Sequence, residues 1–271
     1  MRSVLVFVLF AGAFARGTAG ADTVYKPVGD AAPVRAVQER PYVLQPPDRG
    51  LNAGQAFVGN TISAGRRAGR ALDNGGLESL VNLGYAPGER ITLDGFAGFA
   101  NDGALGATYG ATLRVVAAAQ QWQHPLNVVF SGGALREHDG TPVAQLGYAV
   151  SRDFGKLNVA TTSVFEKAFA PRRDAADAVL TAGASYALAR GWRAGLEAAG
   201  EDLEALVSRA ESEGGARLVA GPTLVFELLE QHLNVGLNAA GGVAYVPRPT
   251  LGDPATAQTA FMTRARVTYT F

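Results

Sequence analysis

Residues 261–271, at the C-terminal end of the chain, alternate between two kinds of side chain. Successive side chains of a β-strand point to opposite faces, so one face here is rich in aromatic and aliphatic groups: Phe261, Thr263, Ala265, Val267, Tyr269 and Phe271. The opposite face carries Met262, Arg264, Arg266, Thr268 and Thr270. A strand with one apolar and one charged face belongs between an apolar and a polar environment, and this pattern constrains the fold more than any other feature of the chain.

The N-terminal end has the three parts of a secretory signal peptide. Arg2 supplies a positive charge, residues 4–15 form an apolar run, and Ala19-x-Ala21 is a small-residue cleavage site. The apolar run is too short for a membrane helix, which needs ~20 apolar residues. We therefore predict that residues 1–21 are removed and that the mature chain begins at Asp22.

The terminal strand resembles the closing strand of a bacterial outer-membrane β-barrel, in which a final aromatic strand ending in Phe is read by the assembly machinery. The resemblance implies a bacterial outer-membrane location, and an even number of strands would place both termini in the periplasm. It also implies that Val267, Tyr269 and Phe271 form the assembly signal, and that the partners are outer-membrane lipids and the barrel assembly machinery.

Charge and cysteine content exclude several classes of function. The chain has 24 basic and 24 acidic side chains, and Arg2 and Arg16 leave with the predicted signal peptide. The mature chain is therefore slightly acidic, which argues against a nucleic-acid partner. There are no cysteines, so disulfides, thiolate metal sites and cysteine nucleophiles are excluded. We expect no cofactor and no metal.

Residues 22–52 are rich in proline and charge and show little periodicity, with Pro41, Pro46 and Pro47 as landmarks. We interpret this segment as an extended periplasmic lead-in. Folding into the lumen of the barrel is an alternative, and disorder is another.

Downstream of the lead-in, segments of roughly ten residues alternate with period two and are separated by turn residues, as transmembrane β-barrels require. We predict an all-β fold for residues 53–271, a closed antiparallel transmembrane β-barrel of about 12 strands, with ten to fourteen as the range. The expected spans are 54–63, 77–85, 90–100, 106–118, 125–136, 141–152, 155–168, 177–189, 191–201, 217–229, 231–246 and 258–271. Short and longer connections alternate between them, and Pro222 requires either a bulge or a strand that starts near it.

Aromatic residues near the expected strand ends predict two interfacial belts. Near the short connections lie Tyr85, Trp122, Tyr186, Trp192, Tyr269 and Phe271. Towards the other rim lie Phe99, Tyr109, Phe165, Tyr245 and Phe261.

The second face of the strands is built mainly of Gly, Ala, Ser, Thr and Asn, which suits a lumen with restricted space. This assignment also places nine charged side chains inside: Glu78, Asp94, Arg114, Glu166, Arg193, Glu197, Glu227, Arg264 and Arg266. They form either a structural network of ion pairs or a binding or selectivity ring for a small solute. Their mixed signs argue against strong ion selectivity.

Catalytic chemistry has one weak candidate. His138 lies between Glu137 and Asp139, where it would act as a general base. The same residues describe an ordinary hairpin loop that turns at Asp139-Gly140. No serine stands at a recognisable spacing from His138, and three adjacent side chains converge poorly on a metal ion. We predict that the protein is not an enzyme.

We predict a passive channel or facilitator for a small solute, with a hydrophobic solute included. A closed structural or adhesive surface barrel with a charge-filled lumen is the alternative, and an outer-membrane hydrolase is the third hypothesis. The hairpin pattern and stretches such as residues 187–197 are similar to a broad class of transporter-like barrels, which includes those of phenol meta-pathway degradation. This similarity implies no functional residue.

Overall fold

The structure is a computed structural model that describes residues 43–44, 51–67, 75–101, 105–170, 177–201, 216–229, 232–246 and 256–271 of the chain. The predicted signal peptide and most of the predicted lead-in lie outside the described residues. Within the described part of the chain, no helix is long and apolar enough to cross a membrane.

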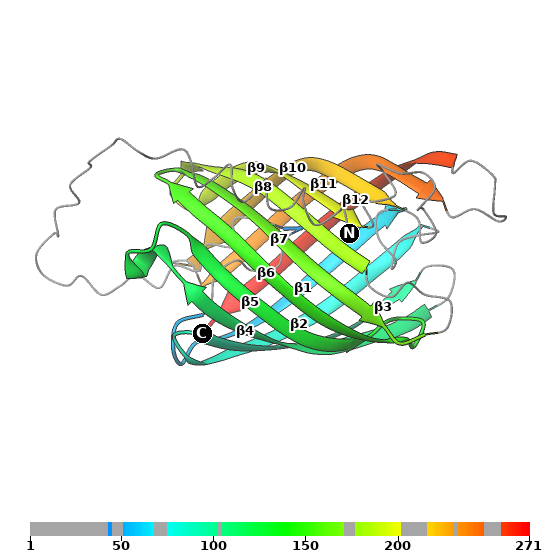
Figure 1. The fold of residues 1–271 in the computed structure, drawn as a ribbon. Coiled ribbons are helices and arrows are strands. Elements are labelled where there is room, and N and C mark those ends of the chain that lie inside the picture. The colour runs from blue at the N-terminus through cyan, green and yellow to red at the C-terminus, as the bar shows by residue number, and fades with distance from the viewer. Residues whose placement is uncertain are drawn as a thin grey trace, which may run out of the picture. The chain divides into compact units, whose positions relative to one another are not determined.

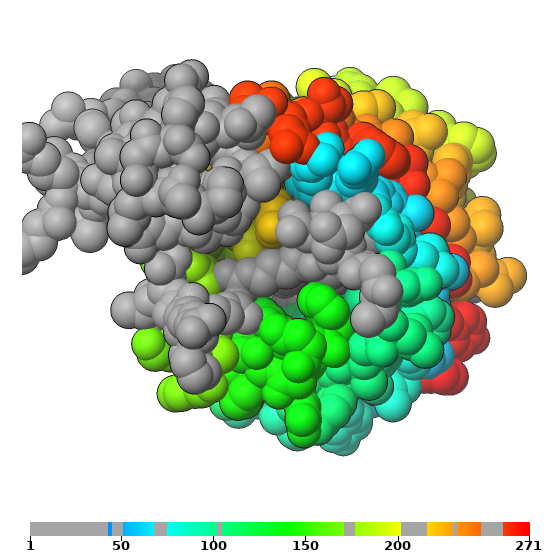
Figure 2. All heavy atoms as spheres, turned by 90° about the vertical axis from the view of Figure 1, so that its right-hand side faces the viewer, coloured from blue at the N-terminus to red at the C-terminus, as the bar shows by residue number. Residues whose placement is uncertain are grey.

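Twelve antiparallel strands form a closed barrel in which each strand pairs with its neighbours in sequence and β12 pairs with β1 (Figure 1). The strands are β1 Ala56–Arg66, β2 Gly76–Gly88, β3 Ile91–Asn101, β4 Leu105–Ala118, β5 Asn127–Arg136, β6 Pro142–Phe154, β7 Leu157–Ala168, β8 Asp177–Ala189, β9 Trp192–Glu201, β10 Arg217–Leu228, β11 Leu233–Val246 and β12 Thr256–Thr270. Viewed towards one end, the colours follow the chain around the ring until red β12 meets the blue-to-cyan β1 (Figure 2). The predicted twelve-stranded barrel is confirmed.

The two rows of connections differ in length. At the end where β1 begins and β12 finishes, β2 and β3 are joined by residues 89–90, β6 and β7 by 155–156, and β8 and β9 by 190–191. The predicted short turn at 120–124 is longer than expected, since residues 119–126 include the 3-10 helix η2 (Gln120–Trp122). At the opposite end, the connection 137–141 is described in full, whereas 202–215 and 247–255 lie outside the described residues.

The closing seam joins the two ends of the described barrel. Val58 on β1 lies opposite Tyr269 on β12, and Asn60 lies opposite Val267. The Phe271 amide N–H donates to the Ala56 carbonyl at 2.8 Å, so backbone pairing continues to the last residue. The side chains of Val267, Tyr269 and Phe271 are all exposed on the outer face, as the alternation predicts.

Pro222 lies inside β10 without either feature that the sequence suggested. Pairing with β9 runs straight through it, with Pro222 opposite Leu196. Ala220 and Thr223 pair with β11 in one continuous register, so there is no bulge, and the strand begins well before the proline. The side chain of Asn238 on β11 satisfies the carbonyl at this position, because its Nδ2 donates to the Pro222 oxygen at 3.2 Å.

The outer face of the barrel is apolar along its whole circumference. Large exposed side chains include Leu83, Leu113, Leu146, Leu196 and Leu237, which come from five different strands. Exposed aromatic residues lie towards both ends: Tyr85, Tyr186, Trp192, Tyr269 and Phe271 at the short-connection end, and Phe99, Tyr109, Phe165 and Phe261 at the other. Trp122 lies in η2 with the Arg90 guanidinium 4.7 Å from its ring, and the side chain of Tyr245 lies outside the described set. An apolar band with aromatic rims is the surface that transmembrane barrels present to lipid.

Candidate lumen site

All nine charged side chains predicted for the lumen lie on the inner face, at buried or half-buried positions that alternate with exposed apolar residues. They come from seven strands: Glu78 on β2, Asp94 on β3, Arg114 on β4, Glu166 on β7, Arg193 and Glu197 on β9, Glu227 on β10, and Arg264 and Arg266 on β12. Their role in solute binding or selectivity stays a prediction.

Asp94 and Arg114 form an ion pair across β3 and β4. The Arg114 Nη2 and Asp94 Oδ2 atoms are 3.0 Å apart, and both side chains are largely buried. Thr92 lies opposite Arg114 and Asp94 opposite Thr112 in the register, so the contact is diagonal. Removal of two charges from water is costly unless they pair, and this pairing meets that requirement within two adjacent strands.

Arg264 connects β12 to β1 and β2. Its Nε donates to Ser63 Oγ at 2.8 Å, and its Nη2 lies 3.8 Å from Glu78 Oε2. Ser63 is opposite both Arg264 and Glu78 in the two registers, so these three side chains form a row across the closing seam. Asn238 continues the row on β11 as the partner of Arg264, which confirms the predicted placement of Arg264 beside the asparagine face.

The inner charges on β7 and β9 contact polar groups of neighbouring strands. Gln145 Nε2 donates to Glu166 Oε1 at 2.7 Å between β6 and β7. Arg193 Nε donates to Ser185 Oγ at 3.3 Å on β8. A further ion pair that the sequence did not suggest joins Arg217 Nη1 to Glu201 Oε2 at 3.0 Å. The inner face therefore resembles the predicted structural network over much of its circumference.

Glu197 has a different kind of partner. Its Oε1 accepts the backbone N–H of Val43 at 2.8 Å, and its Oε2 accepts the backbone N–H of Leu44 at 2.6 Å. The Thr223 hydroxyl donates a short hydrogen bond to Oε1. Glu197 is only 2% exposed. Hydrogen bonds to an ionised acceptor are about twice as strong as neutral ones, so this carboxylate is well placed to bind main-chain amides inside the barrel.

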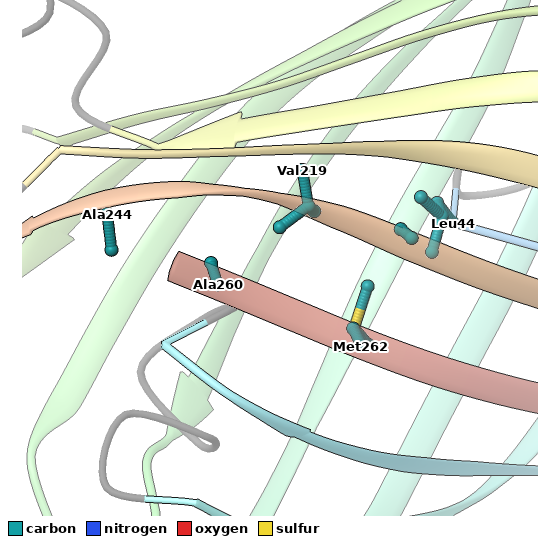
Figure 3. Close-up of a cluster of buried hydrophobic side chains, with 6 residues drawn as sticks. Leu44, Val219, Ala244, Ala260 and Met262 are labelled. Atoms are coloured by element: carbon teal, nitrogen blue, oxygen red, sulfur yellow. The ribbon is translucent and has the colours of Figure 1, made fainter. Parts of the chain in front are cut away.

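An apolar cluster lies next to Glu197. Leu44 belongs to one buried apolar cluster with Val219 on β10 and Met262 on β12, so residues from three separate segments of the chain contribute to it (Figure 3). The cluster also contains Ala240, Ala244 and Ala260. Leu44 is 6% exposed, and burial of a leucine side chain is worth up to about 1.5–3 kcal/mol. Val43 and Leu44 thus lie within the barrel, which favours the lumen alternative over an extended periplasmic position for this pair.

Sequence reasoning did not identify Val43, Leu44, Val219 and Thr223 as members of this site. The available signal was the short apolar run Tyr42-Val-Leu44 between Pro41 and Pro46, which stands out in a polar segment. The period-two pattern marks Val219 and Thr223 as inward-facing, but it does not identify what they contact.

The connection around His138 is a hydrogen-bonded hairpin loop. The Thr141 amide donates to Asp139 Oδ1 at 2.8 Å, and the Gly140 amide donates to the Glu137 carbonyl at 2.9 Å. Gly140 has a φ of 89°, which glycine adopts without strain. In the described part of the chain, no three His, Cys, Asp or Glu side chains are grouped so that they could hold a metal ion. The loop geometry agrees with the interpretation of Asp139-Gly140 as a turn.

No family model matches the chain, and no curated protein matches it. Solved structures nevertheless share its fold. An outer membrane channel from Pseudomonas putida F1 aligns with a TM-score of 0.56 at 11% identity, over 84% of this chain and 100% of that one. The KdgM porin aligns with a TM-score of 0.55 at 8% identity, over 79% of this chain and 99% of that one. A structure of the KdgM porin in complex with disordered oligogalacturonate aligns with a TM-score of 0.54 at 8% identity, over 80% of this chain and 99% of that one. The chain therefore has the closed β-barrel fold that outer-membrane channels use.

Proposed function

We propose that this protein is a passive channel for a small solute in the bacterial outer membrane. The observation that carries the proposal is the opposition of the two faces: an apolar outer surface around the whole barrel, and an inner surface of polar and charged groups. Lipid leaves backbone groups no hydrogen-bonding partner, so a closed barrel suits a membrane and its polar interior suits a solute path.

Orientation follows from the connections. Short turns lie at the end where β1 begins and β12 finishes, and in barrels of this type short turns are periplasmic. We therefore propose that both termini are periplasmic. The exposed Val267, Tyr269 and Phe271 would be available to the barrel assembly machinery during insertion, while outer-membrane lipids cover the apolar band.

The charge pattern of the inner face favours weak ion selectivity. Both acidic and basic groups line the lumen and several of them pair, as Asp94 does with Arg114. Rings of a single charge sign are what give pores strong selectivity. The apolar cluster around Val219 and Met262 adds a surface for hydrophobic solutes, so small sugars and small aromatic compounds are both suitable probes. The resemblance to barrels of phenol meta-pathway degradation stays a prediction and assigns no solute.

The test is reconstitution of the refolded mature chain in planar bilayers and in liposomes. Discrete openings, a reversal potential close to zero in a KCl gradient, and liposome swelling with a small solute are expected. Absence of conductance and of solute flux at every voltage would contradict the channel.

A closed structural or adhesive barrel is the second candidate. The ion pairs of the inner face and the position of Val43 and Leu44 beside Glu197 favour it, since both fill the lumen. The two candidates differ in solute flux, which the same reconstitution measures. A hydrolase is the third hypothesis, and lipid hydrolysis that is retained after His138→Ala would remove its one candidate residue.

A further inference from the structure

We propose that the inner face of β9–β12 is a binding site for a polypeptide segment, and that this chain's own Val43–Leu44 is an occupant that restricts passage through the barrel. The site would take two successive backbone N–H donors whose own side chains are apolar. The inference rests on the proposed channel function, because the segment can restrict solute passage only if solute passes through the barrel.

The polar half of the site is the Glu197 carboxylate. Its two oxygens accept N–H groups from two consecutive residues, Val43 and Leu44. The carboxylate therefore recognises the backbone of the segment at two adjacent positions. The Thr223 hydroxyl, which itself accepts from Asn238 Nδ2 at 2.7 Å, donates to the same carboxylate. Glu197 is therefore positioned by two further strands, which is the arrangement of a built acceptor site rather than of a mobile surface group.

The apolar half of the site is shaped to the occupant. Leu44 lies in the same buried apolar cluster as Val219 and Met262. On the neighbouring strand β11, a Cβ atom added at Gly236 would lie 2.6 Å from Val43 Cγ2, while the next atom outside Val43 would be 3.8 Å away. The space left by the missing side chain of Gly236 is thus filled by Val43, and by no part of the barrel wall at comparable distance.

This geometry provides a wall substitution that acts on the occupant. Gly236→Ala adds a methyl group to the lumen, which would narrow an otherwise empty passage. If Val43 occupies that space, the methyl group instead displaces the Val43–Leu44 segment, and conductance increases. An empty passage therefore predicts that Gly236→Ala lowers the conductance, whereas a passage occupied by Val43 predicts that it raises the conductance.

The first experiment compares single-channel recordings of the full mature chain with those of Gly236→Ala and Glu197→Gln. Both variants should raise the open probability by about tenfold. Glu197→Gln weakens the hydrogen bonds that hold the segment, and the methyl group of Gly236→Ala takes the space of the Val43 side chain. Gly241→Ala, on the exposed outer face of the same strand, controls for the substitution of a strand glycine, because a Cβ atom there meets nothing within 4 Å. Glu89→Gln, in the exposed turn between β2 and β3, controls for the loss of an acidic charge. Neither control should change the open probability.

The second experiment measures occupancy without conductance. The chain has no cysteine, so Leu44→Cys combined with Met262→Cys creates a unique pair of thiols. A short bis-maleimide that a reductant cleaves should link this pair in the folded barrel. Leu44→Cys combined with Ala100→Cys, a buried inner position on β3, should link poorly. The linked barrel should stay shut, and cleavage of the linker should restore the openings of the unlinked protein.

The outcomes separate the two proposals. Equal linking of both cysteine pairs, or equal conductance of Gly236→Ala and Gly241→Ala, would overturn the inferred site while leaving the channel intact. Selective linking with no conductance in any variant would confirm the occupant and contradict the channel function. Selective linking with full conductance in the linked state would overturn the restriction of passage.

Discussion

The inner polar groups on the two sides of the barrel have different kinds of partner. On the β3–β8 side, inner polar groups contact partners on adjacent strands of the wall itself, as in the Asp94–Arg114 ion pair and the Gln145–Glu166 hydrogen bond. On the β9–β12 side, the carboxylate of Glu197 and the cluster around Val219 contact the N-terminal Val43–Leu44 pair. The charged groups of the first side are paired within the wall, where the Thr92 hydroxyl also accepts the Leu51 amide N–H at 3.3 Å. The second side presents a buried carboxylate and an apolar surface to the Val43–Leu44 pair.

The difference shows that a lumen-facing charge has two distinct uses. Asp94 has its countercharge fixed by strand pairing, so its interactions are set when the sheet forms. Glu197 is coupled to a segment far away in sequence, so its interactions depend on where that segment lies. The following predictions test this contrast, in order of decreasing effect.

A charge placed on the outer face should destabilise the barrel by a similar amount on either side. Leu113 on β4 is 44% exposed and Leu196 on β9 is 66% exposed, and both lie near the middle of their strands. Substitution of either by Arg places a charge in the apolar band, and each should lower the free energy of unfolding by ~2–4 kcal/mol. Urea unfolding in lipid vesicles measures the effect. A large difference between the two sites would show that the barrel is not uniformly surrounded by lipid.

The Asp94–Arg114 pair should be strongly coupled. Both side chains are largely buried, and their charged atoms are 3.0 Å apart. A double-mutant cycle with Asp94→Asn and Arg114→Gln should give a coupling free energy of about 1–3 kcal/mol. Neither substitution should affect linking of Leu44→Cys to Met262→Cys, because the pair lies on the opposite side. A loss of linking would contradict the independence of the two sides.

Asn238 should contribute more to the stability of the barrel than Asn234, although both side chains are buried on the inner face of β11. Asn238 donates to the Pro222 carbonyl and to Thr223 Oγ1, next to the break that proline makes in the ladder. Asn238→Ala should lower the free energy of unfolding by about 1–2 kcal/mol. Asn234 has no hydrogen bond from its side chain within the described part of the chain, so Asn234→Ala is the control and should have little effect. Equal losses in urea unfolding would contradict the role of Asn238 beside Pro222.

The Glu78–Arg264 ion pair should have a smaller coupling free energy than the Asp94–Arg114 pair. Its charged atoms are 3.8 Å apart, and Arg264 is more exposed than either member of the Asp94–Arg114 pair. A double-mutant cycle with Glu78→Gln and Arg264→Gln should give a coupling free energy of about 0–1 kcal/mol, and salt should weaken it further. A coupling as large as that of the Asp94–Arg114 pair would show that the closing seam is held together by charge.

The strands and the direction of their side chains could be read from the sequence. Alternation over 233–245 and over 261–271 identifies β11 and β12 and assigns each residue to a face, because period-two geometry is a local property of extended backbone. The same reasoning placed Glu78, Arg193 and Glu197 inside. It failed at Pro222, which lies inside a continuous strand and whose carbonyl accepts from the Asn238 amide on another strand.

What the lumen charges contact was decided by tertiary structure. The register between strands determines that Arg264 lies beside Ser63 and opposite Asn238. The bond from Leu44 to Glu197 spans 153 positions of sequence, and no local pattern links two such residues. Periodicity specifies which face a side chain occupies, whereas closure of the barrel and placement of the N-terminal pair specify its partner.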